Sequence, residues 1–139
     1  RMGIPVMGHL GLTPQAVHRL GYRRQATDAI SQERLLEQAC TLEQKGCFSL
    51  VLEHVPAELA CRVQQALTIP VIGIGAGDGC DGQVRVTADL LGLTAKQPPF
   101  SPALVDGRRL FIDALKGWVQ QTRNNTLPTT ESPQSAPDC

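Results

Sequence analysis

The chain has 139 residues, no formal net charge and 42% hydrophobic residues, few of them aromatic. This composition gives no basic surface for nucleic acid or for a membrane surface, and no apolar run approaches the roughly 18 residues of a membrane span. The length suits one small domain.

The cysteines and the start of the chain carry two further expectations. No two cysteines have the CxxC spacing of a zinc site, so we expect reduced thiols in a cytoplasmic protein. Residues 1–5 lack the apolar core of a signal peptide and lead directly into a strand. We therefore expect that a segment upstream belongs to the same protein.

The first predicted strand covers residues 4–9 and ends on His9. A helix is predicted over residues 13–20, because Thr13 can cap it and a proline follows at its first position. Residues 21–28 form a polar loop, and we interpret its two arginines as part of a solvated loop, with anion binding as the less favoured alternative.

The middle of the chain alternates helices and strands. Apolar residues recur with helical spacing over residues 31–45, and Gly46 then ends that helix. A strand over residues 47–52 leads to Glu53, and a second clear helix covers residues 56–67.

The next two predicted strands cover residues 69–77 and 82–87, and a short turn covers residues 88–91. A connector over residues 97–102 then leads to a helix over residues 103–122. The run over 69–77 is almost continuously apolar, as in a strand covered on both faces.

Strands alternating with amphipathic helices predict an α/β fold with a parallel sheet. Four strands are half of those in a (β/α)₈ TIM barrel, so we expect the carboxyl-terminal half of such a barrel. Residues 1–122 form this half-barrel domain, and residues 123–139 have the composition of a disordered tail.

Glu53 is the candidate catalytic base. It follows a buried strand immediately, where barrels place catalytic groups, and partial burial would raise its pKa toward neutral pH. A glutamate at this position could instead cap the next helix. His9 ends the first strand and would face the same rim, although a lone histidine is often a structural residue.

The glycines of the 73–77 segment complete neither a P-loop nor a dinucleotide-binding motif. We interpret them as a strand end that lets a substrate or another backbone approach closely.

Three ordered motifs resemble the ketopantoate hydroxymethyltransferase family, namely GHLGLTPQ at 8–15, LVLE with VP at 50–56, and IPVIGIGAG with DGQ at 69–83. The resemblance covers roughly residues 3–93. It implies a barrel of the phosphoenolpyruvate/pyruvate type.

The implied reaction transfers a hydroxymethyl group from 5,10-methylenetetrahydrofolate to the small oxo-acid 3-methyl-2-oxobutanoate. Glu53 then corresponds to the family's proton acceptor, and His9 to a histidine that contacts the oxo-acid. The family's magnesium ligands lie in the other half of its barrel, so Mg²⁺ is expected with no ligand assigned here. The full-length family forms homo-oligomers.

Two alternatives stay open at this point. The chain could belong to another 2-oxo-acid lyase or aldolase on the same barrel. It could also be an inactive half-barrel, and we expect no activity from the isolated chain.

Overall fold

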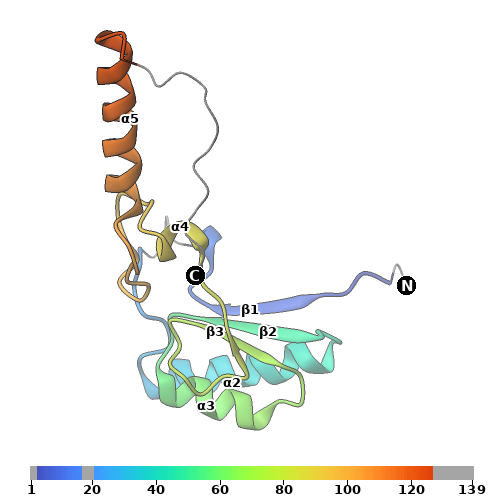
Figure 1. Cartoon of the computed structure of the whole chain (residues 1–139). Coiled ribbons are helices and arrows are strands. Elements are labelled where there is room, and N and C mark those ends of the chain that lie inside the picture. The colour runs from blue at the N-terminus through green and yellow to red at the C-terminus, as the bar shows by residue number, and fades with distance from the viewer. Residues whose placement is uncertain (1–2, 17–20, 127–139) are drawn as a thin grey trace, which may run out of the picture.

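The structure is a computed structural model that describes residues 3–16 and 21–126 (Figure 1). Its elements in chain order are β1 (Met7–Gly11), η1 (Pro14–Ala16), α2 (Ala29–Gln44), β2 (Ser49–Glu53), α3 (Ala57–Ala66), β3 (Val71–Ile74), β4 (Gly82–Gln83), α4 (Thr87–Leu90) and α5 (Gly107–Arg123).

The four strands form one sheet in the order β1-β2-β3-β4, and every neighbouring pair is parallel. Gly11 lies opposite Glu53, and Glu53 lies opposite Ile74. The predicted parallel α/β fold is confirmed. Because the strands are parallel, their carboxyl ends meet along one edge of the sheet.

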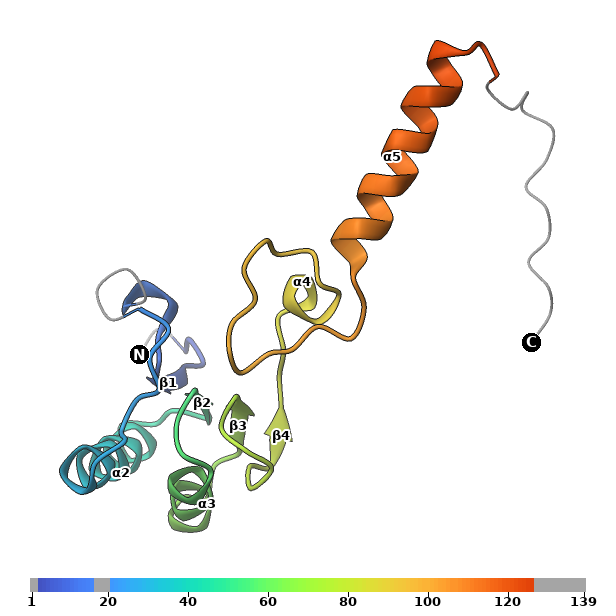
Figure 2. The same ribbon diagram turned by 90° about the vertical axis from the view of Figure 1, so that its left-hand side faces the viewer.

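Helices α2 and α3 cover only one face of this sheet (Figure 2). Side chains alternate between faces along a strand, so Leu50, Leu52 and Val71 point toward the helices and are fully buried. They pack against residues of the helices: Leu35, Ala39, Leu59, Ala60 and Val63. The same alternation places His9, Val51 and Glu53 on the opposite face.

The ends of α2 follow from local hydrogen bonds. Asp28 accepts from the backbone N–H of Ser31 at 2.9 Å, and the Ser31 hydroxyl accepts from the Asp28 backbone N–H at 3.3 Å, which completes a capping box. Beyond its far end, Gly46 takes a left-handed φ of 94°, as the sequence predicted.

The first strand differs from its predicted bounds. It starts at Met7 and runs to Gly11, so His9 lies at its middle and not at its end. Pairing continues because Leu10 and Gly11 keep register with β2, and the Leu12 N–H donates to the Glu53 carbonyl at 2.8 Å.

The predicted strand over residues 82–87 is mostly wrong, because β4 contains only Gly82 and Gln83. Val84 and Val86, whose alternation suggested the longer strand, are 46% and 52% exposed. The chain turns into α4 at Thr87, close to the predicted turn.

Helix α5 begins at Gly107, four residues after its predicted start, because the Asp106 side chain accepts from the Arg109 N–H and caps it there. The helix projects away from the sheet in both views (Figures 1 and 2). The apolar side chains of Leu110 and Leu115 on this helix are each 62% exposed.

Two predictions fall on undescribed residues. The second half of the 13–20 helix and residues 127–139 of the proposed tail lie outside the described residues. Within the described ranges, no helix combines the length and apolar character needed to cross a membrane.

Candidate active site

His9 and Glu53 contact each other on the uncovered face of the sheet. Nε2 of His9 lies 3.1 Å from Oε2 of Glu53. They are diagonal neighbours on adjacent strands, because His9 pairs with Val51 and Glu53 pairs with Gly11. The structure thus brings together the two residues that the sequence singled out.

The backbone of Glu53 is fixed by the end of β1. Its carbonyl accepts the Leu12 N–H, and Gly11 approaches so closely that a Cβ there would lie 2.2 Å from the Glu53 carbonyl oxygen. Gly11 also has a φ of 90°, which favours glycine. These constraints position the carboxylate.

Partial burial raises the pKa of Glu53, while the charge of His9 and its hydrogen bond act in the opposite direction. The Glu53 side chain is 13% exposed and that of His9 is 33% exposed. A carboxylate whose pKa is raised holds a proton more tightly, which suits a general base.

His54, which follows the candidate base, makes different contacts. Its ring packs against Phe100 with centroids 4.4 Å apart, and its φ of 51° is left-handed. Burial, and then the charge of Arg24, lower the pKa of His54. The stacking links the end of β2 to the connector before α5, a contact that sequence spacing did not indicate.

The arginine loop is attached to the same rim. Nη2 of Arg24 donates to the Val55 carbonyl at 3.3 Å, and the Gln25 N–H donates to the His54 carbonyl at 2.9 Å. Arg23 and Arg24 are both exposed, which agrees with a solvated loop, and Arg24 in addition binds the backbone beyond the candidate base.

The glycine segment after β3 allows close packing, as expected. A Cβ at Gly75 would lie 2.6 Å from the Phe100 ring, and one at Gly77 would lie 2.4 Å from the Cβ of Ala57. The segment accordingly brings the connector and α3 against the end of β3. Phe100 is a rim residue that the sequence analysis missed.

The described residues do not fit a metal site of their own. Over 3–16 and 21–126, no three His, Cys, Asp or Glu side chains gather so as to hold an ion. The cysteines described, Cys40, Cys47, Cys61 and Cys80, are free, which agrees with the expectation of reduced thiols.

A parallel α/β sheet with a carboxylate and an imidazole in contact near the carboxyl ends of its strands is an arrangement that proton-transferring enzymes use. Sequence comparison gives the particular family. The chain belongs to the ketopantoate hydroxymethyltransferase family, whose model matches residues 1–130.

Relatives with the printed name 3-methyl-2-oxobutanoate hydroxymethyltransferase agree with this assignment. The protein of Synechococcus sp. (strain CC9605) is 97% identical over 129 residues, which are 93% of this chain and 48% of that protein. Those of Synechococcus sp. (strain CC9902) and Parasynechococcus marenigrum (strain WH8102) are 72% and 70% identical, over 100% and 99% of this chain. The chain spans about half the length of these curated relatives.

Proposed function

We propose that this chain carries the proton acceptor of a 3-methyl-2-oxobutanoate hydroxymethyltransferase. The reaction transfers a hydroxymethyl group from 5,10-methylenetetrahydrofolate to 3-methyl-2-oxobutanoate and gives 2-dehydropantoate, in pantothenate biosynthesis. The family assignment supports the reaction. The observation that carries the chain's role is the contact of Glu53 with His9 at 3.1 Å on the open face of the sheet.

The chemistry begins with a C–H bond next to a ketone, which is a weak acid. The Glu53 carboxylate takes this proton, and its raised pKa makes it a better acceptor. The electron pair left on carbon attacks the activated methylene carbon of the folate and forms the new C–C bond. Both C–N bonds to that methylene carbon break in the course of the reaction, water supplies the hydroxyl group, and tetrahydrofolate is the second product. His9, which is partly exposed beside Glu53, contacts the oxo-acid and holds the carboxylate in place.

We propose that the sheet is half of a (β/α)₈ barrel of the phosphoenolpyruvate/pyruvate type. Its strands are parallel and consecutive, and its helices cover one face alone, as the outer layer of a barrel does. The face that carries His9 and Glu53 would then line the barrel interior.

The resemblance also implies Mg²⁺, which would act as a Lewis acid on the oxo-acid. Because the described residues offer no group that could hold it, its ligands are expected in the remaining half of the full-length protein. We further propose a cytoplasmic homo-oligomer whose other ligands are the oxo-acid and the folate.

The test uses a full-length chimaera, in which this chain replaces the matching segment of the protein from Synechococcus sp. (strain CC9605). Glu53→Gln keeps the size of the side chain but removes the basic oxygen. We expect turnover to fall about 10²–10⁴-fold, the usual contribution of a general base. Product formation is measured with both substrates present.

Glu58→Gln is the matched control, because Glu58 lies exposed in the first turn of α3. Turnover by Glu53→Gln equal to that of the control would remove Glu53 from its proposed role. Carbon–carbon cleavage by the unmodified chimaera without folate would instead favour a lyase or aldolase.

A further inference from the structure

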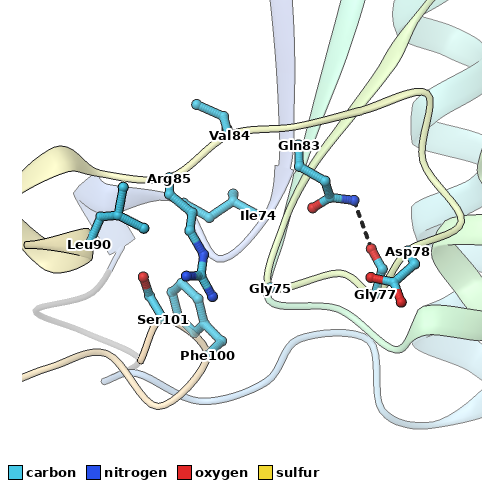
Figure 3. Close-up of a pocket in the computed structure, with 10 residues that line it drawn as sticks. All are labelled: Ile74, Gly75, Gly77, Asp78, Gln83, Val84, Arg85, Leu90, Phe100 and Ser101. Atoms are coloured by element: carbon cyan, nitrogen blue, oxygen red, sulfur yellow. Dashed lines mark hydrogen bonds between the residues drawn. The ribbon is translucent and has the colours of Figure 1, made fainter. Parts of the chain in front are cut away.

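A cavity of about 530 Å³ opens where β3 and β4 end (Figure 3). It is next to the candidate base but separate from it: Ile74, which lies opposite Glu53 in the sheet, lines the cavity, whereas Glu53 and His9 do not. A space of this size can hold a small organic molecule.

The two ends of the cavity differ in charge (Figure 3). Arg85 lies at one end beside Phe100 and Ser101, and Asp78 lies at the other end near Gln83. The Gln83 amide donates to the Gly77 carbonyl at 2.9 Å, which holds the glycine segment at the acidic end. A ligand therefore meets a cation at one end only.

Arg85 is exposed to solvent. Among the described residues, its guanidinium makes one hydrogen bond, from Nη1 to the Pro102 carbonyl, at a long 3.5 Å. The ion pairs of the described chain do not include it. Because a guanidinium has five N–H donors in a planar fork, most of them remain for a planar anion such as a carboxylate.

Ser101 lies at the same end of the cavity and supports a ligand site independently of Arg85. It is 1% exposed, and its Oγ has no hydrogen-bond partner among the described residues. Buried hydroxyls are nearly always paired, so an unpaired one that lines a cavity indicates a missing polar group. An oxygen atom bound by Arg85 would supply an acceptor at this end.

Apolar side chains also line the cavity. Ile74, Leu90 and the Phe100 ring line it together with Arg85. The Phe100 ring is fixed between His54 and Gly75. The body of the ligand can therefore be apolar or aromatic while its charge faces Arg85.

We propose that this cavity is a carboxylate-binding subsite, with Arg85 as the cationic partner and Ser101 beneath it. Both substrates of the proposed function carry carboxylates, so the oxo-acid and the glutamate end of the folate are the two sources of this chemistry. The assignment to a substrate rests on the proposed function, but binding of a carboxylate does not.

The first experiment titrates the full-length chimaera with benzoate and with the neutral benzamide. The ring of benzoate matches the apolar lining of the cavity, and its carboxylate matches Arg85. We expect benzoate to bind at least tenfold more tightly than benzamide, and Arg85→Gln to abolish that preference. Ser101→Ala should keep it in part. Binding is followed by saturation-transfer NMR or calorimetry.

Arg34→Gln is the matched control, since Arg34 is exposed on α2 and does not line this cavity. Absence of benzoate binding, or equal binding by Arg85→Gln, would overturn the proposal. A benzoate preference that depends on Arg85 in a protein without hydroxymethyl transfer would uphold the subsite and reject the proposed function.

The second experiment identifies the source of the carboxylate. In the active chimaera, Arg85→Gln should raise the KM of one substrate about tenfold, leave that of the other within twofold and change kcat little. If the affected substrate is the folate, an analogue that lacks the glutamate should lose its dependence on Arg85. Unchanged KM values for both substrates would overturn the substrate assignment.

Discussion

The pair formed by Glu53 and His9 shows how two weak signals in a sequence become one site. Each residue alone has a structural explanation, either as a helix cap or as a satisfied histidine. Their side chains nonetheless meet at 3.1 Å, because a diagonal pair on parallel strands shares a face. Through this contact the charge of His9 acts on the pKa of Glu53.

The pH dependence of activity follows from this coupling. As the proposed base, Glu53 can accept a proton only when ionised, and burial raises its pKa, so we expect kcat/KM to fall on the acid side at a pH above the ordinary glutamate range. The charge of His9 lowers that pKa. His9→Gln should therefore move the acid limb to still higher pH, as measured by a pH–rate profile of the chimaera.

His54→Gln serves as the comparison, because His54 contacts Phe100 and is not among the groups that shift the pKa of Glu53. Its acid limb should stay where that of the parent lies. An acid limb that moves to lower pH in His9→Gln would contradict the proposed coupling.

At the scale of the elements, Gly11 joins the fold to the site. It has the left-handed φ of 90° and leaves no space for a Cβ, which would collide with the Glu53 carbonyl. The end of β1 can pair closely with β2 only because this residue is glycine. The same contact holds the backbone of the base.

Gly11→Ala should destabilise the chimaera by about 1–3 kcal/mol and reduce kcat, because the end of β2 must shift to admit the methyl group. Urea unfolding and steady-state kinetics measure the two effects. Gly46→Ala is a close control, since Gly46 has a similar φ of 94° but open space around it. That variant should lose stability from backbone strain and keep kcat; an equal loss of kcat in both would exclude a positioning role for Gly11.

The elements also show what the sequence could predict. Helices α2 and α3 were predicted from apolar periodicity and strand β2 from an apolar run, and all three lie close to their predicted ranges. The ends of β1, β3, β4 and α5 were misplaced, and β3 covers only Val71–Ile74 of the predicted 69–77. Those ends depend on pairing with a neighbouring strand or on the Asp106 cap, which periodicity does not record.

Part of the candidate site could also be predicted from the sequence. Glu53 lies at the end of its strand, as predicted from the rule that parallel strands place functional groups at one edge of a sheet, whereas His9 was expected at a strand end and lies at the middle of β1. Phe100 and Arg85 were not predicted, because they reach the rim from a connector and from the residues after a two-residue strand. Only the folded chain places these segments beside β3.

At the scale of the whole molecule, the described chain leaves much of its surface uncovered. The sheet has a free edge at β1, one of its faces carries no helix, and α5 exposes Leu110, Phe111, Leu115 and Trp118 by more than half. Open edges and apolar patches promote association.

The isolated 139-residue chain should therefore self-associate or unfold without a sharp transition, and it should show no transferase activity. Sedimentation velocity and scanning calorimetry test this, with the full-length chimaera measured in parallel. A monodisperse chain of 15.0 kDa that unfolds cooperatively would contradict the expectation.

The strict succession of the strands has a kinetic consequence. Each ladder of this sheet joins strands that follow one another in the chain, so forming the sheet closes only loops of moderate length. Parallel sheets form slowly in general, and this succession makes their assembly faster than a shuffled strand order would. In relatives of about twice this length, the slowest step of folding would then be the pairing of the outer strands, β1 and β4, with segments far away in the sequence.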